Sequence, residues 1–296
     1  MYKFRYIFEE PLINIKILNK LNNLSINIKG KLIDFETPKI MGILNINNDS
    51  FYDGGRFNSK DKALKQVEKM FNEGADFIDI GAATSKPGSE RISTEKEKKI
   101  LFPILETLLK KFPDSFFSID TYRSEIAEKS IQIGASIIND ISGGKFDKNM
   151  FKVISKYKVP YIMMHIKGNP NTMQLNPKYE NVVVEILNFF IKQTKKAYNN
   201  GITDIIIDPG FGFGKSLNHN YELLKSLSLF KEINCPILIG VSRKSMIYNI
   251  INKDSKHALN GTTVLNTFGL MNGANIIRVH DVKEAKECIS LWEYLH

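Results

Sequence analysis

The sequence predicts a (β/α)8 barrel, an α/β fold, and three observations predict it. Eight short β-rich segments alternate with eight helical segments between about residue 38 and the C-terminus. Several of the strands are continuously apolar, which is typical of a parallel sheet buried on both faces. Most of the strands end in hydrogen-bonding or charged residues, as expected where a barrel gathers its active-site groups at one end.

The elements follow one another regularly, with glycine or proline at many of the junctions. The expected strands are 39–46, 77–81, 116–120, 136–141, 160–165, 204–209, 236–242 and 275–282. The expected helices are 61–73, 94–112, 124–133, 148–157, 179–199, 218–231, 257–271 and 283–294. We expect one barrel domain over residues 38–296.

Residues 1–37 precede the barrel and form an N-terminal extension. Two apolar segments, 13–17 and 24–28, predict a β-hairpin within it. We expect this hairpin to cover the bottom of the barrel.

The composition is that of an ordinary globular protein of 296 residues, with 43% hydrophobic and 25% charged residues. No apolar run approaches the ~18 residues of a membrane span, and the first ten residues do not resemble a signal peptide. Cys235 and Cys288 lie far apart without metal-type spacing, so we interpret them as reduced thiols. A cytoplasmic protein without a membrane partner is expected.

The formal net charge is +9, but the lysines are scattered over the predicted helices. Nucleic-acid binding needs positive charge focused on one face or tract, so no nucleic-acid partner is expected. A basic bias of this kind helps instead to attract a small anionic substrate. A basic RNA-binding or scaffold protein built on an inactive barrel is the alternative from another functional class.

The strand 276–282 carries the most informative pattern in the chain. Arg278 and His280 are two residues apart, so they project from the same face of the strand. A cationic pair at the end of a strand is suited to bind an anion.

The other strand ends divide into two chemical groups. Asp120, Asn139 and Asp208 offer carboxylate and amide groups that suit a flat, nitrogen-rich heterocycle. A second set suits a phosphate group and a bridging metal, and consists of Lys244, Arg278, His280 and Asn45. Mg²⁺ commonly takes one or two protein ligands together with phosphate oxygens and water, and the Asn45 oxygen is a suitable ligand. The sequence thus predicts a heterocycle at depth and a phosphate at the rim.

Three further segments complete the predicted site. The loops 47–59 and 82–93 are longer than usual βα loops, which predicts lids. Residues 208–215 contain three glycines and a lysine without P-loop spacing. We interpret this segment as a tight turn that presents Phe213 to the pocket. His165 and His219 are interpreted as structural, with His219 at a helix start.

At these positions the sequence resembles the dihydropteroate synthase family of the folate pathway, over most of the chain from Lys39 to Leu295. The matching motifs are 41–45, 49–51, 53–55, 74–81, 118–121, 137–140, 164–165, 208–215, 242–245 and 278–282. The resemblance implies a barrel that is usually a homodimer. It also implies condensation of a 7,8-dihydropterin-6-ylmethyl diphosphate with p-aminobenzoate, with release of diphosphate.

The resemblance also implies roles for individual residues, and these follow the family motif position by position. The position of Asn45 binds Mg²⁺, and those of Asp120, Asn139, Asp208 and Lys244 bind the pterin. Arg278 and His280 hold the diphosphate together with Asn45. Ser85, Pro87, Phe213 and Ser242 line the aminobenzoate side, and Met164 lies in a matching motif and is counted with the substrate-binding residues. Asp120, Lys244 and Arg278 are the catalytic candidates.

Two segments depart from the family pattern, and both fall on the aminobenzoate side. Asn47 and Asn48 replace the usual Thr-Pro, and Ala83 to Lys86 replace Glu-Ser-Thr-Arg. The nearest alternative is a pterin-binding methyltransferase barrel that works with a corrinoid protein. Residues 242–245 and the 49–55 motif argue against it.

Overall fold

The computed structural model describes residues 24–46, 55–82 and 92–295, and its main sheet contains eight parallel strands. They are β3 (Lys39–Asn45), β4 (Phe77–Gly81), β5 (Phe116–Asp120), β6 (Ile137–Asp140), β7 (Tyr161–Met164), β8 (Ile205–Asp208), β9 (Leu238–Ile239) and β10 (Ile276–Val279). Each predicted strand is present within its expected range.

The sheet curves into a nearly closed barrel. Its strands are hydrogen-bonded in the order β8-β7-β6-β5-β4-β3-β10-β9. The remaining gap, between β8 and β9, is spanned by a parallel bridge between Ile207 and Ile237, and the Ile207 N–H donates to the Pro236 carbonyl at 2.9 Å. Strand β9 is shorter than the predicted 236–242, and the chain turns after it at Arg243, which has a φ of 54°.

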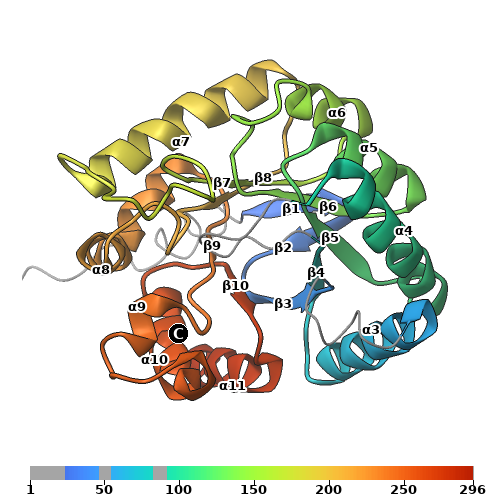
Figure 1. Cartoon of the computed structure of the whole chain (residues 1–296). Coiled ribbons are helices and arrows are strands. Elements are labelled where there is room, and N and C mark those ends of the chain that lie inside the picture. The colour runs from blue at the N-terminus through green and yellow to red at the C-terminus, as the bar shows by residue number, and fades with distance from the viewer. Residues whose placement is uncertain (1–23, 47–54, 83–91, 296) are drawn as a thin grey trace, which may run out of the picture.

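Helices surround the barrel (Figure 1). They are α3 (Gly55–Asn72), α4 (Thr94–Lys111), α5 (Ser124–Ile133), α6 (Met150–Tyr157), α7 (Val182–Asn199), α8 (Leu217–Lys225), α9 (Ser245–Tyr248), α10 (Leu259–Met271) and α11 (Val282–Glu293), with 3-10 helices η1 (Leu227–Ile233) and η2 (Ser255–His257).

Two helix predictions need correction. Helix α3 begins at Gly55, six residues before the expected start, so the predicted 47–59 loop is shorter at its C-terminal end. Glycine is unfavourable inside a helix but well tolerated at its N-terminal boundary, and for this reason the pattern misplaced the start. The predicted helix 218–231 is divided at Ser226, where tighter i to i+3 bonding takes over in η1.

Alternation along the strands places polar groups inside the barrel. The bottom of the barrel is filled by an inner apolar cluster of Met41, Phe77, Ile137, Ile162, Ile206, Leu238 and Ile276. Neighbouring residues such as Ile78, Ile138 and Ile207 face the helices and belong to the outer core. Since residues i, i+2 and i+4 share a face, the inward positions above the apolar cluster are the ones that carry the predicted site residues.

An antiparallel hairpin of β1 (Ser25–Ile28) and β2 (Lys31–Asp34) covers the bottom of the barrel. Ile26 and Ile28 are buried in the inner apolar cluster, and the Asn27 N–H donates to Asp204 Oδ1 at 2.7 Å. The expectation of an N-terminal hairpin at the bottom of the barrel is therefore confirmed.

The pairing of that hairpin differs from the prediction. The partner of residues 25–28 is 31–34, whereas the expected partner, 13–17, lies outside the described residues. Lys29 and Gly30, with φ angles of 52° and 83°, form the two-residue turn. This turn needs two positive φ angles, and lysine is not a typical residue for the first position.

In the described part of the chain, no helix is both long and apolar enough to cross a membrane. Cys235 and Cys288 are both buried and free, as predicted.

Candidate active site

The predicted polar residues converge at the carboxyl ends of the strands. Each lies two or four residues after a member of the inner apolar cluster, or after Phe116, which packs against that cluster. Because side chains alternate between the two faces of a strand, each of them faces the barrel interior. These inward residues are Asn45, Asp79, Asp120, Asn139, Met164, Asp208, Ser242, Arg278 and His280. Gly81 and Gly240 occupy inward positions between them and leave space, because neither carries a side chain.

Asp79, which the sequence analysis did not single out, is at the centre of a buried hydrogen-bond network. It is fully buried on β4, and its Oδ2 accepts hydrogen bonds from Arg278 Nε at 2.7 Å and from Asn139 Nδ2 at 2.8 Å. The sequence does contain a signal for Asp79. It is an acidic residue within an apolar strand, and it lies two residues after Phe77, so both side chains point into the barrel.

Asp120 shares Arg278 with Asp79. Arg278 Nη2 donates to Asp120 Oδ2 at 3.1 Å. Burial, followed by the charge of nearby Asp79, raises the pKa of Asp120 to about 7, although Arg278 acts in the opposite direction. The structure therefore brings Asp120, Asn139 and Arg278 together, and it makes the charge of Asp120 sensitive to pH near neutrality.

Asp208 lies on the opposite side of this interior, at the end of β8. Its Oδ1 accepts a hydrogen bond from the Gly210 N–H at 2.7 Å. Burial raises its pKa, while the nearby charge of Lys244 opposes that rise. The side chain is therefore held by its own loop and lies within electrostatic reach of Lys244.

Lys244 extends towards the glycine-rich turn. Its Nζ donates to the Phe211 carbonyl and lies 4.7 Å from the centroid of the Phe213 ring. Burial lowers the pKa of Lys244 to about 8, with Asp208 opposing the shift. Gly212, with a φ of 80°, permits this approach, because a Cβ there would lie 3.3 Å from the lysine Cδ.

The segment 208–215 is the predicted tight turn. Gly210, Gly212 and Gly214 all have positive φ angles. Lys215 holds the turn from beneath, and its buried Nζ donates to the carbonyls of Gly210 at 2.8 Å and Phe213 at 3.1 Å. The same Nζ lies 3.1 Å from His165 Nδ1. Burial lowers the pKa of Lys215 well below its ordinary value.

The two histidines interpreted as structural have structural contacts. His165 is buried and packs edge-on to Phe189 at 4.9 Å between ring centroids. His219 lies in the first turn of α8, where its N–H donates to Ser216 Oγ and its Nδ1 accepts from the Ser216 N–H. His219 therefore lies at a helix start, as predicted, and the contacts of His165 are with neighbouring residues of the fold.

An apolar wall borders the polar groups. Met164 packs in a small buried cluster with Ile141, Ile166 and Met173, and Phe213 contacts this cluster together with Tyr122 and Phe146. A flat ring inserted among the polar groups would therefore meet methionine and aromatic surface as well.

Ser242 and His280 form a pair at the mouth of the barrel. Ser242 Oγ lies 3.0 Å from His280 Nδ1, and the His280 N–H donates to the same oxygen at 3.2 Å. Burial and the nearby positive charge of Arg278 lower the pKa of His280 to about 4. The ring is therefore neutral at pH 7 and offers a hydrogen bond rather than a positive charge.

Outside the mouth, Arg243 makes two hydrogen bonds to Asp281, at 2.8 and 2.7 Å. This ion pair ties the chain segments after β9 and β10 together and fixes Ser242 and His280 beside each other.

Asn45 lies near Asp120 across Gly81. A Cβ on Gly81 would lie 3.6 Å from Asn45 Oδ1 and 3.7 Å from Asp120 Oδ2. Both oxygens thus lie within 3.7 Å of one point beside Gly81, and an amide oxygen such as that of Asn45 is a type of ligand that Mg²⁺ accepts. Among the described residues, no group of three or more His, Cys, Asp or Glu side chains is arranged to hold a metal ion by itself.

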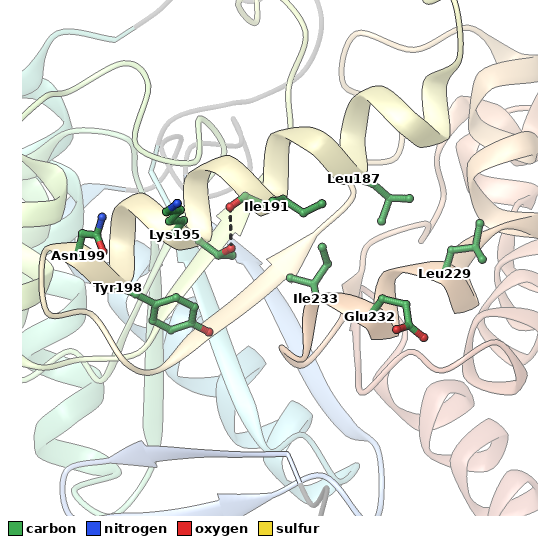
Figure 2. Close-up of a pocket in the computed structure, with 9 residues that line it drawn as sticks. Leu187, Ile191, Lys195, Tyr198, Asn199, Leu229, Glu232 and Ile233 are labelled. Carbon is green, nitrogen blue, oxygen red and sulfur yellow. Dashed lines mark hydrogen bonds between the residues drawn. The ribbon is translucent and has the colours of Figure 1, made fainter.

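Ser85 and Pro87 lie outside the described residues, as do most of the two loops predicted as lids. A cavity of about 520 Å³ lies elsewhere, on the outer face between α7 and η1, and is lined by residues such as Leu187, Ile191 and Ile233 (Figure 2). None of its lining residues belongs to the site described above.

The chain was compared with known proteins. A family model described as pterin binding enzyme matches residues 41–280. Dihydropteroate synthase of Escherichia coli K12 is 40% identical over 267 residues, which cover 90% of this chain and 94% of that protein.

Two solved structures have the same fold. Yersinia pestis dihydropteroate synthase with a sulfonamide drug superposes with a TM-score of 0.85 at 36% identity, and covers 92% of this chain and 98% of that one. The Thermus thermophilus enzyme in complex with 4-aminobenzoate gives a TM-score of 0.83 at 31% identity, and covers 92% and 100%.

Proposed function

The chain belongs to the pterin-binding enzyme family and works as a dihydropteroate synthase, and from that premise we propose how its residues divide the reaction between them. The enzyme condenses (7,8-dihydropterin-6-yl)methyl diphosphate with p-aminobenzoate to give 7,8-dihydropteroate and diphosphate. The single observation that supports our assignment best is the inward layer of polar side chains around Asp120 and Arg278.

The pterin ring binds at depth, between Asp120 and Asp208. Ionised carboxylates accept hydrogen bonds from the ring N–H and the exocyclic amine, and Asn139 adds an amide oxygen. Lys244 reaches the same region from the start of α9 and donates to a ring acceptor. Met164 supplies apolar contact to the ring face.

The diphosphate binds nearer the mouth, at Arg278 and His280. Arg278 Nε and Nη2 donate to Asp79 and Asp120, so the remaining guanidinium N–H groups are the donors for phosphate oxygens, and the neutral imidazole donates one hydrogen bond. Ser242 fixes which His280 nitrogen faces the anion, because its hydroxyl occupies Nδ1.

We propose that Mg²⁺ joins this site through Asn45, with Asp120 beside it across Gly81. When bound, the ion neutralises charge on the diphosphate oxygens and so makes diphosphate a better leaving group.

The aminobenzoate binds above the pterin, against Phe213 and Ser242, with Ser85 and Pro87 assigned to the same side. The Thermus thermophilus relative holds 4-aminobenzoate, which supports a binding site for the second substrate in this family. Here Phe213 is oriented by the glycine turn and by Lys244 over its ring.

The chemistry replaces one bond with another. The C–O bond between the pterin methylene carbon and diphosphate breaks, and its electron pair leaves with diphosphate. The amine nitrogen then forms a C–N bond to that carbon and releases one proton. Because the amine is already a nucleophile, Asp120, Lys244 and Arg278 act by positioning and by stabilising charge rather than by activating a nucleophile.

We further propose a cytoplasmic homodimer. The buried free thiols of Cys235 and Cys288 suit a reducing compartment. Exposed apolar side chains on α10, namely Val264, Phe268 and Met271, supply a face that a second copy can cover. Sedimentation of the purified protein tests the assembly, and a monomer at micromolar concentration contradicts it.

One assay tests the whole assignment. Release of diphosphate should require p-aminobenzoate, the pterin diphosphate and Mg²⁺ together, and the organic product should be 7,8-dihydropteroate. Methyl transfer from a reduced folate to a corrinoid protein would instead indicate the methyltransferase alternative. Absence of both reactions, with RNA bound tightly, would indicate the binding-protein alternative.

A further inference from the structure

Asp79 has contacts that stability alone does not explain. Its side chain is fully buried, and its Oδ1 has no hydrogen-bond partner among the described residues. A buried carboxylate with an unpaired oxygen destabilises a fold relative to an apolar residue of similar size. Such groups call for a functional reason.

The contact between Asp79 and Asn139 fixes the orientation of an amide. An ionised carboxylate can only accept hydrogen bonds, so Asn139 must present its NH₂ group to Asp79 Oδ2, which lies 2.8 Å away. The Asn139 Oδ1 is consequently left as an acceptor, and it is buried without a partner among the described residues. The amide is therefore arranged to receive a donor from a ligand.

The same Asp79 oxygen also holds Arg278. Arg278 Nε donates to it at 2.7 Å, while the other branch of the guanidinium reaches Asp120. One carboxylate thus fixes a residue assigned to the pterin and a residue assigned to the diphosphate.

We infer that Asp79 is a positioning residue that determines pterin specificity: it turns the Asn139 amide so that its oxygen accepts from a donor of the heterocycle, and it aligns Arg278. This inference rests on the proposed function, since it concerns the same site. It adds a residue that contacts neither substrate and acts through two residues that do.

Replacement of Asp79 by asparagine tests the inference. The asparagine can keep an oxygen at the Oδ2 position, but that oxygen is neutral. Its hydrogen bonds to the Asn139 amide and to Arg278 are therefore weaker, and both side chains are held less firmly for the pterin diphosphate. We expect the Michaelis constant for the pterin diphosphate to rise on the order of 10- to 100-fold, the effect of losing a hydrogen bond to a charged or buried group. The constant for p-aminobenzoate should change by less than about twofold.

Two further measurements separate positioning from a general loss of structure. In a double-mutant cycle with Asn139→Ala, the effect of Asp79→Asn on pterin affinity should shrink, because the amide through which it acts is gone. Ser118→Ala is the matched control, since Ser118 is a fully buried inward residue on β5 whose hydroxyl has no partner among the described residues.

The pH profile provides an independent readout. Asp120 is surrounded by Asp79, Arg278, Glu97, Asp140 and Lys244, and Asp79 is the nearby carboxylate that most raises its pKa. Removal of that charge should lower the pKa of Asp120, so that pterin affinity begins to fall at a lower pH than in the wild type. A purely structural defect would instead lower pterin affinity at every pH.

The outcomes are distinguishable. A wild-type enzyme without p-aminobenzoate-dependent diphosphate release contradicts the proposed function itself. An active wild type with additive effects in the cycle, or with equal losses for both substrates, overturns the role of Asp79 alone.

Discussion

At the scale of single residues, the site is governed by a shared guanidinium. Arg278 contacts two carboxylates, Asp79 and Asp120, and only one of them is exposed enough to meet a ligand. Two buried acids and one cation leave a negative surplus, and the pKa of Asp120 rises to about 7 as a result of burial and that surplus. The charge of Asp120, which we propose recognises the pterin, therefore depends on pH near neutrality.

This leads to a prediction about pH. Because the pKa of Asp120 is raised, its carboxyl group is ionised above about pH 7 and protonated below it. Pterin affinity should be full above pH 8 and should fall about tenfold per unit as the pH drops below 7. Calorimetric titration from pH 5.5 to 8.5 measures this.

Asp120→Asn is the control for that prediction. Asparagine cannot titrate, so the variant should bind the pterin weakly, and its affinity should not fall further as the pH drops below 7. If pterin affinity of the variant falls below pH 7 as it does in the wild type, another group titrates.

A second prediction concerns Arg278→Ala. Loss of the guanidinium should weaken diphosphate binding on the order of 10- to 100-fold and leave two buried carboxylates unpaired, at a cost of about 3–5 kcal/mol in the free energy of unfolding. Diphosphate calorimetry and urea unfolding measure the two effects.

Lys98→Ala is the matched loss of a positive charge, because Lys98 pairs with Glu95 and Glu125 on the exposed surface. It should change stability by less than about 1 kcal/mol and leave diphosphate binding intact. Equal losses of diphosphate affinity in both variants would mean that net charge, not the Arg278 site, attracts the anion.

At the scale of elements, the turn after β8 links backbone geometry to Phe213, on the side that we propose for the second substrate. Gly210 has a φ of 72°, and a Cβ there would lie 2.0 Å from the His165 carbonyl oxygen. The turn can approach β7 this closely only without a side chain, and Lys215 fastens it from below. Phe213 and Lys244 depend on that position.

We therefore predict that Gly210→Ala displaces the turn. The Michaelis constant for p-aminobenzoate should rise several-fold, and the free energy of unfolding should fall by more than the ~1–2 kcal/mol of left-handed strain.

Gly30→Ala is its matched control, since Gly30 has a φ of 83° with open space around it. In this variant the free energy of unfolding should fall only by the cost of left-handed strain, and both Michaelis constants should stay unchanged. The same kinetic defect in both variants would refute a specific role for the turn.

At the scale of the whole molecule, stability and activity occupy opposite ends of the barrel. The hairpin fills the bottom with Ile26 and Ile28, while the polar residues gather at the carboxyl ends of the strands. The apolar layer between them separates the two, so changes at the bottom should not reach the substrates.

Ile28→Ala tests this separation. A fully buried isoleucine removed from this cluster should cost about 2–5 kcal/mol in the free energy of unfolding, while kcat and both Michaelis constants stay within about twofold of wild type at 20 °C. Leu32→Ala, at a side chain that is 69% exposed in the same hairpin, should be nearly neutral. A changed Michaelis constant in Ile28→Ala would show that the two ends are coupled.

Much of this architecture follows from patterns that are local in the chain. Apolar runs such as Ile205–Ile207 predicted buried strands, and polar residues directly after them predicted the site. The resemblance of the motifs indicated the reaction, which the comparisons support. The positive-φ glycines of the 208–215 turn were also recognisable, because few other residues adopt that conformation.

The tertiary structure decided what depends on the closed ring of strands. Asp79 and Arg278 are 199 residues apart, and only the parallel pairing of β4 with β3 and of β3 with β10 brings them within 2.7 Å. The hairpin partner was likewise decided by a turn that lacks a typical sequence. Short-range patterns determine which face a residue occupies, whereas the partner it meets there and the resulting pKa depend on strand order and burial, which no local segment encodes.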